Sequence, residues 1–125
     1  MKIILISNDT EVIAVIQGID ILLHEQLIVF NSTLTDSCEI LSEIISNNPS
    51  LIIFDNDYLE EDTVKILKSL RKIDSKVAII LVTSELSIEL GRELSQLSIH
   101  YKALKPISSS SIEASIKSLK KLTIH

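Results

Sequence analysis

The sequence predicts an α/β fold in which a doubly wound, five-stranded parallel sheet is covered by five helices. Short blocks of Ile, Leu and Val alternate along the chain with segments whose apolar residues follow helical spacing. The blocks are nearly continuous, which is typical of parallel strands buried on both faces. Since 46% of the 125 residues are hydrophobic, we expect residues 1–125 to form one domain with a substantial core.

The first two strands are expected at residues 2–7 and 26–30, which are rich in Ile, Leu and Val. A helix with Gly18 as a weak point is predicted between them. Its apolar positions are Val12, Ile16, Ile19 and Leu23. A second helix is predicted to follow residue 30 and to end at residues 47–49. Its N-cap candidates are Ser32, Thr33 and Thr35, and its apolar face is Leu34, Cys38, Leu41 and Ile45.

The third strand is expected in residues 51–57, where four apolar residues lead directly into Asp55 and Asp57. Residues 60–74 predict a helix with acids in its first turn and bases in its last, as the helix dipole favours. Residues 76–83 form the most apolar block and therefore the expected central strand. A fourth helix, a fifth strand at 98–104 and a closing helix capped by serines 108–111 complete the pattern. The two helical faces are Leu86, Leu90, Leu94 and Leu97, then Ile112, Ile116, Leu119 and Leu122.

Composition excludes several classes of protein. No segment approaches the roughly 18 apolar residues of a membrane span, and the N-terminal apolar run is too short for a signal-peptide core. The net charge of −5 with scattered Lys and Arg argues against direct nucleic-acid binding. The single cysteine, Cys38, is interpreted as a buried structural thiol in a reducing compartment. We therefore expect a cytoplasmic protein with neither linker nor output domain in this chain.

Polar residues follow four of the predicted strands. They are Asn8 and Asp9, then Asp55, then Thr83 and Ser84, and finally Lys105 with Pro106. In an open parallel sheet the carboxyl ends of the strands form one rim, so these side chains are expected to converge. Carboxylate and carbonyl oxygens suit Mg²⁺, while a Thr hydroxyl and a Lys ammonium suit a phosphoryl group. The pattern indicates phosphoryl transfer to a carboxylate.

At these positions the chain resembles the receiver domains of two-component response regulators, which have a flavodoxin-like fold of five βα units. The resemblance rests on "SND", "FDN", "LVTS" and "ALKP" in this order along essentially the whole chain. It implies Asp9 as an acid of the metal site and Asp55 as the phosphoacceptor. It also implies catalytic roles for Thr83 and Lys105, a cis peptide bond before Pro106, and Mg²⁺ as the cofactor.

The chain departs from the family pattern near these motifs. Asn8, a candidate residue of the metal site, stands where a first acid is usual. It can orient a metal-bound water but brings no charge, so Mg²⁺ binding is expected to be weaker. Asp57 stands where the family supplies a backbone carbonyl to the metal, and its carboxylate is a candidate replacement for the missing charge. The usual Met-Pro and Gly are absent after Asp55. Lys102, next to Tyr101, takes the place of a switch aromatic and is expected to stay in solvent.

Simpler roles compete with the functional ones. Asp55 is also compatible with an ordinary strand-end turn, Thr83 and Ser84 with a helix cap, and Lys105 with a solvated lysine. The acids at 60–62 are interpreted as charges at a helix N-terminus rather than as metal ligands. The three histidines, His24, His100 and His125, lack metal-ligand spacing and are expected to be exposed.

Three functions remain open from the sequence. The first is a phosphorylation-controlled interaction module that takes a phosphoryl group onto Asp55 and loses it again, with no other enzymatic activity. Its partners would be a sensor histidine kinase or phosphotransfer protein, a downstream output protein, and a second copy bound through the fourth helix, fifth strand and fifth helix. The second is a pseudo-receiver that binds partners without phosphorylation. The third is a haloacid-dehalogenase-type phosphatase, which matches "FDND" but has only Glu113 as an acid after Lys105.

Overall fold

The computed structural model describes residues 1–22, 25–31 and 36–123. They form one sheet of five parallel strands in the order β2-β1-β3-β4-β5, which confirms the predicted doubly wound architecture. The strands are β1 (Lys2–Ile6), β2 (Gln26–Phe30), β3 (Leu51–Asp55), β4 (Ala78–Thr83) and β5 (Tyr101–Leu104). With β1, β3 and β4 inside the sheet, the strand ends that carry the polar residues are neighbours.

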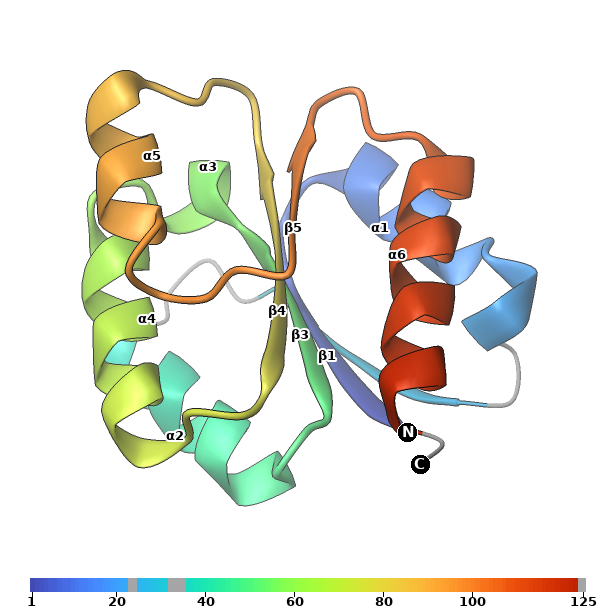
Figure 1. Cartoon of the computed structure of the whole chain (residues 1–125), viewed down its shortest axis with the longest axis horizontal. Helices are drawn as coiled ribbons and strands as arrows, with labels where there is room; N and C mark the ends of the chain where they lie inside the picture. Colours follow the sequence, from blue (N-terminus) through green and yellow to red (C-terminus); the bar gives the residue numbers. More distant parts are fainter. Residues whose placement is uncertain (23–24, 32–35, 124–125) are drawn as a thin grey trace.

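Helices cover both faces of the sheet (Figure 1). One layer contains α1 (Thr10–Gln17) and α6 (Ser109–Thr123), and the other contains α2 (Ser37–Asn47), α4 (Asp62–Ile73) and α5 (Ile88–Leu94). Two short elements complete the described chain: the 3-10 turn η1 (Asp20–Leu22) and the helix α3 (Asn56–Leu59). No helix in the described residues is long and apolar enough to cross a membrane.

The core consists of two apolar layers, one on each face of the sheet. Alternate residues of a strand point to opposite faces, so every interior strand supplies both layers. In β3, for example, Ile53 packs on the side of α1 and α6, whereas Ile52 and Phe54 pack on the side of α2, α4 and α5. All five residues of β3 are buried, which explains why the sequence shows a continuous apolar block there rather than alternation.

The helices differ from the prediction in number and in length. The described residues contain six α-helices rather than five, because α3 begins directly after β3 with Asp55 as its N-cap. The first helix ends at Gln17 with Gly18 as its C-cap, and the chain turns through η1, so the helix expected to run through residue 23 is shorter. Leu23 lies outside the described residues. Gly18 is therefore a helix end rather than a weak point within the helix.

The predicted face of α2 is wrong. The helix buries Ile40 and Ile44, while Cys38 is exposed and Ile45 is 48% exposed. Two apolar stripes of similar size compete on this helix, and the sheet packs against the one that contains Ile40 and Ile44. Cys38 is consequently not a buried structural thiol. Asp36 provides the N-cap, and the candidates Ser32, Thr33 and Thr35 lie outside the described residues, as does Leu34.

The C-terminal elements follow the prediction more closely. The side chains of Ile112, Ile116 and Leu119 are buried along α6. At the start of this helix the Ser108 hydroxyl oxygen accepts a hydrogen bond from the Ser111 N–H at 3.4 Å. The side chain of Leu122 lies outside the described part of the chain. The fourth predicted helix is shorter than expected, because Leu86 precedes α5 and is 41% exposed. Ser87 is the N-cap of α5, so neither Thr83 nor Ser84 has that role.

Candidate functional site

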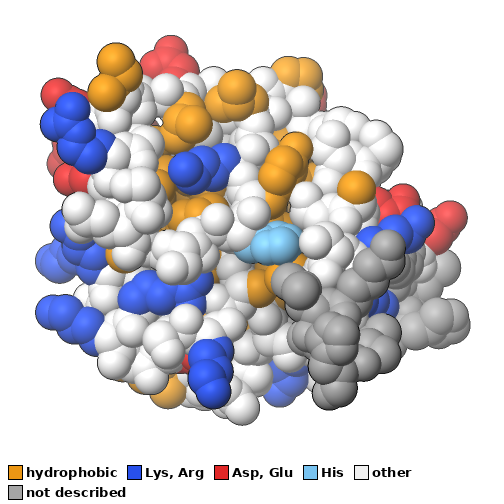
Figure 2. All heavy atoms as spheres, in the orientation of Figure 1, with side chains coloured by type: hydrophobic (Ala, Val, Ile, Leu, Met, Phe, Trp, Pro, Cys, Tyr) orange, Lys and Arg blue, Asp and Glu red, His pale blue; other side chains and the backbone are white. Residues whose placement is uncertain are grey.

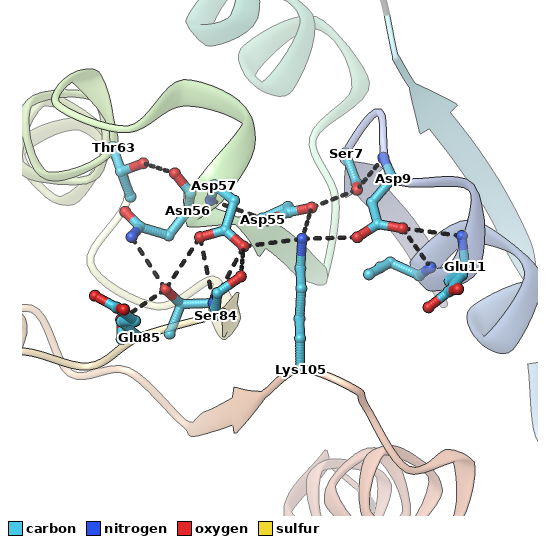
Figure 3. Close-up of polar contacts among 12 residues, drawn as sticks. Ser7, Asp9, Glu11, Asp55, Asn56, Asp57, Thr63, Ser84, Glu85 and Lys105 are labelled. Atoms are coloured by element: carbon cyan, nitrogen blue, oxygen red, sulfur yellow. Dashed lines mark hydrogen bonds and ion pairs between the residues drawn. The ribbon is translucent and has the colours of Figure 1, made fainter.

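The carboxyl ends of β1, β3, β4 and β5 bring the predicted site residues together at one edge of the sheet (Figure 3). Asp9 follows β1 and caps α1 by accepting the Glu11 N–H at 2.9 Å. Asp55 is the last residue of β3, and Thr83 is the last of β4. Lys105 follows β5, and its side chain extends between the aspartates. The register of the parallel strands thus produces the convergence that the sequence predicts.

Lys105 is the centre of this cluster. Its Nζ lies 2.9 Å from Asp9 Oδ2, 3.0 Å from Asp55 Oδ2 and 3.1 Å from Asp57 Oδ2. Burial alone would lower the pKa of the ammonium, but hydrogen bonds to the three carboxylates raise the pKa above its ordinary value. Only 16% of the side chain is exposed, so Lys105 is not a solvated lysine. The peptide bond between Lys105 and Pro106 is cis, as the resemblance implied.

Both carboxylate oxygens of Asp55 are engaged. Oδ1 accepts the Asp57 N–H at 3.0 Å, and Oδ2 accepts the Ser7 hydroxyl at 2.7 Å as well as the Lys105 ammonium. The Asp55 side chain is only 1% exposed. Ser7 is fully buried and was not identified from the sequence, although a polar residue that ends an Ile-rich strand is a usable signal.

The partly exposed side chain of Asp57 points toward Ser84, the residue that follows β4. Its carboxylate accepts the Ser84 N–H, at 3.2 Å to Oδ1 and 3.1 Å to Oδ2, and a short hydrogen bond from the Ser84 hydroxyl. Burial would raise the pKa of Asp57, but the hydrogen bonds from Ser84 and Lys105 outweigh it, so the pKa lies below its ordinary value. The pKa of Asp9 is also lowered, chiefly by its hydrogen bond with Lys105.

Thr83 is buried next to Asp57 without a direct bond to Asp55. Its hydroxyl lies 2.8 Å from the Glu85 carbonyl oxygen, to which it donates, and accepts a hydrogen bond from Asn56 Nδ2 at 3.2 Å. Asp57 Oδ1 is at the longer distance of 3.5 Å. Asn56 Oδ1 is buried and has no hydrogen-bond partner. Asn56 was not identified from the sequence; its contact joins the start of α3 to Thr83 at the end of β4.

Other predicted residues lie outside the cluster. Asn8 is exposed, and among the described residues no hydrogen bond of its side chain joins it to the aspartates. Lys102 is exposed, as expected. Glu61 and Asp62 are exposed at the start of α4, which fits charges at a helix N-terminus.

The histidine prediction is wrong at the one histidine within the described residues. His100 is half-buried, with Nε2 3.2 Å from the Ser115 carbonyl oxygen, because it lies where β5 begins to pack against α6. His24 and His125 lie outside the described residues. Glu113, the acid considered for a phosphatase, is 3.6 Å from Lys117 on α6.

The donor atoms of the cluster suit Mg²⁺ in kind and in charge. Carboxylate oxygens of Asp9, Asp55 and Asp57 are hard ligands, and three carboxylates with one ammonium carry a net charge of −2. In the described part of the chain, however, no three His, Cys, Asp or Glu side chains are grouped to hold a metal ion. Lys105 Nζ lies between the three aspartates, within 3.1 Å of one oxygen of each. The ammonium therefore competes with a metal ion for the same oxygens.

Solved structures with the same fold include receiver domains. An N-terminal domain of an uncharacterized protein from Wolinella succinogenes has a TM-score of 0.82 at 15% identity, covering 99% of this chain and 97% of that one. A response regulator from Desulfuromonas acetoxidans has a TM-score of 0.75 at 18% identity, covering 97% of both chains. A response regulator receiver domain protein from Methanospirillum hungatei has a TM-score of 0.76 at 20% identity, covering 94% and 92%.

These likenesses confirm the predicted resemblance at the level of the fold. No protein-family model and no curated protein matches the sequence. The chain has the flavodoxin-like fold of response regulator receiver domains over nearly its whole length. What this chain does must be argued from its own site.

Proposed function

We propose that the chain is a receiver module of two-component signalling and that Asp55 accepts the phosphoryl group. The observation that carries the proposal is the placement of Asp55 at the end of β3 with the Lys105 ammonium 3.0 Å from its Oδ2. A carboxylate at the carboxyl edge of a parallel sheet, next to a fixed cation, has the surroundings that phosphoryl transfer requires. The hydroxyls of Thr83 and Ser84 lie on the same rim.

In the proposed reaction an Asp55 oxygen attacks the phosphorus of a phosphohistidine on a sensor histidine kinase or phosphotransfer protein. A P–O bond forms, the P–N bond breaks, and the histidine nitrogen keeps the electron pair and takes up a proton. Lys105 balances the negative charge on the phosphoryl oxygens. Asp9 and Asp55, with Asp57, are the proposed ligands of Mg²⁺, which when bound would neutralise phosphoryl oxygens. Later attack by water on the acyl phosphate would return the module to its starting state.

Signal output would pass through the surface formed by α5, β5 and α6. Figure 2 views this side of the molecule and shows hydrophobic side chains exposed between the two helices. Leu104 at the end of β5 is 56% exposed and Ile88 at the start of α5 is 83% exposed. We propose this surface for a downstream protein or for a second copy of the chain. The proposed location is the cytoplasm, where a kinase domain would meet it.

The test is incubation with acetyl phosphate and Mg²⁺, followed by intact mass spectrometry. The wild type is expected to gain one labile phosphoryl group, and Asp55→Asn is expected to gain none. Asp62→Asn is the matched control, because it changes an exposed carboxylate on α4 and leaves the site intact. A mass gain that survives in Asp55→Asn would assign the acceptor elsewhere.

A second candidate function is a pseudo-receiver that binds partners without phosphorylation. The observation that favours it is the closed state of Asp55, which is 1% exposed and has partners on both oxygens. Absence of any mass gain over a wide range of Mg²⁺ concentrations would favour this candidate. The two candidate functions share a fold and a binding surface. They differ in whether Asp55 becomes phosphorylated.

A further inference from the structure

The side chain of Asp57 is held by donors on two residues, Ser84 and Lys105, that directly follow β4 and β5. Ser84 supplies its N–H and its hydroxyl, and Lys105 supplies its ammonium at 3.1 Å from Oδ2. The Thr83 hydroxyl oxygen lies 3.5 Å from Oδ1. A backbone N–H, a hydroxyl and an ammonium that point at one place form a site for an oxyanion. In this structure the oxyanion is a carboxylate of the chain itself (Figure 3).

The same donors are the ones that a phosphoryl group on Asp55 would need. Lys105 Nζ joins the two aspartates, at 3.0 Å from Asp55 Oδ2 and 3.1 Å from Asp57 Oδ2. Asp57 also donates its N–H to Asp55 Oδ1 at 3.0 Å, so its carboxylate lies close beside the proposed acceptor. New phosphoryl oxygens placed next to Asp55 would meet the Asp57 carboxylate, and two anions cannot share these donors without strong repulsion.

We propose that Asp57 is an internal occupant of the phosphoryl site, which a tetrahedral oxyanion fills only after the Asp57 carboxylate leaves. The inference rests on the proposed function in that the phosphoryl group of Asp55 is the competing ligand. Asp57 thus sets how readily Asp55 is phosphorylated. The chain with Asp57 in place already satisfies the donors that phosphorylation would otherwise engage.

The position of Asp57 makes this exchange feasible. Its side chain is 33% exposed, whereas that of Asp55 is 1% exposed, so Asp57 can turn toward water while Asp55 cannot. The hydrogen bond that Asp57 makes to Asp55 uses its backbone N–H, and this bond survives rotation of the side chain. The cost of opening is the loss of charge-assisted hydrogen bonds from Ser84 and Lys105.

The experiment is a titration with inorganic phosphate, in which the amide NMR signal of Ser84 reports occupancy. Asp57→Ala vacates the site. Asp57→Asn and Asp9→Asn form a matched pair, because each removes one negative charge that faces Lys105 Nζ, at 3.1 and 2.9 Å, but only Asp57 also holds Ser84. Asn at position 9 remains a good N-cap for α1. Equal additions of sodium chloride control for ionic strength.

We expect half-saturation of Asp57→Ala at a phosphate concentration at least about tenfold below that of the wild type. Asp57→Asn should shift in the same direction, and Asp9→Asn should differ from the wild type by less than about threefold. Equal phosphate affinity in Asp57→Ala and wild type would overturn the inference. An equal gain in Asp9→Asn and Asp57→Asn would also overturn it, because general charge removal would then be the cause. If Asp57→Ala does not fold, this matched pair decides.

Phosphorylation by acetyl phosphate separates this inference from the proposed function. Tighter phosphate binding in Asp57→Ala without any phosphoryl gain on Asp55 supports the internal occupant and contradicts the receiver activity. Phosphorylation of wild type and Asp57→Ala at equal rates, with equal phosphate affinity, contradicts the internal occupant and leaves the receiver activity supported. Faster phosphorylation of Asp57→Ala, together with tighter phosphate binding, supports both.

Discussion

Two partly buried cations, Lys105 and Arg71, lie at different places in the fold and have partners of different kinds. Lys105 at the carboxyl edge of the sheet contacts three side-chain carboxylates. Arg71, in the last turn of α4, contacts only backbone carbonyl oxygens among its hydrogen-bond partners in the described residues. The contacts of Lys105 can therefore be exchanged for contacts with a ligand, whereas those of Arg71 stabilise the fold.

Arg71 joins three segments of backbone. Its Nε donates to the Leu97 carbonyl at 2.8 Å, and its two terminal nitrogens donate to Val77 at 2.7 Å and Ser98 at 3.1 Å. Ser98 has a positive φ of 55°, a conformation that non-glycine residues adopt infrequently. The guanidinium therefore stabilises the turn between α5 and β5 and the start of β4. Burial lowers the pKa of Arg71, because neutral carbonyls offset little of the desolvation.

The difference between these cations has a simple physical origin. Carboxylate side chains can rotate, take up protons or bind another cation, so the contacts of Lys105 can be exchanged without unfolding the chain. Backbone carbonyls are fixed by the fold and remain unsatisfied if their donor is removed. We infer that Lys105 has a role in ligand binding at the site, whereas Arg71 stabilises the folded chain.

The largest effect on stability is expected from Arg71→Ala. Loss of the guanidinium leaves several carbonyls without donors, so the free energy of unfolding should fall by about 2–4 kcal/mol. Arg71→Lys should recover less than half of this loss, because one ammonium cannot span the same carbonyls. Urea denaturation measures both. A loss below about 0.5 kcal/mol in Arg71→Ala would indicate that water replaces the guanidinium as the donor to these carbonyls. Arg71 would then not be required for the stability of the fold.

An intermediate effect, with a distinct pH dependence, is expected from Lys105→Met. In the wild type the lowered pKa values of Asp9 and Asp57 contribute stability that is present near neutral pH and is lost as the pH falls below about 4. Without the ammonium the carboxylates of the site repel one another, which raises the pKa values of Asp9 and Asp57. We expect a loss of about 1–2 kcal/mol at pH 7 that diminishes toward pH 5 as a carboxylate becomes protonated.

Denaturation of the Lys105→Met variant at pH 5, 6 and 7 tests this expectation. Arg71→Ala is the control, because its carbonyl partners do not titrate and its loss should be the same at the three pH values. If the loss of unfolding free energy changed with pH equally in both variants, the protonation of the site carboxylates would not depend on Lys105.

The smallest effect, of opposite sign, is expected from Gly91→Ala in α5. A Cβ at this position meets no atom within 4 Å, so alanine should stabilise the helix by about 0.5–1 kcal/mol through its higher helix propensity. The gain should appear in the wild type and also with Arg71→Ala, since α5 precedes the turn that Arg71 holds. Thermal unfolding of the single and double variants measures it. No gain in either background would show that α5 contributes little to the cooperative unit.

Much of the site was predictable because it depends on local sequence. Apolar runs locate the strands, and the carboxyl ends of parallel strands share an edge. The sequence therefore predicts that Asp9, Asp55, Thr83 and Lys105 are neighbours. The cis peptide bond before Pro106 followed from the resemblance. The sequence alone also determined the βα order, since the periods of strand and helix differ along the chain.

The tertiary structure decided which atoms meet. It buried Ile40 and Ile44 of α2 rather than Cys38, because two apolar stripes on one helix are equivalent until a sheet packs against one of them. Ser7 donates a hydrogen bond to Asp55, which is 48 positions away in the sequence. Ser84 donates to Asp57, which is 27 positions away. Hydrophobic periodicity is a property of neighbouring residues, whereas hydrogen bonds between strand ends depend on distances that only the folded chain defines.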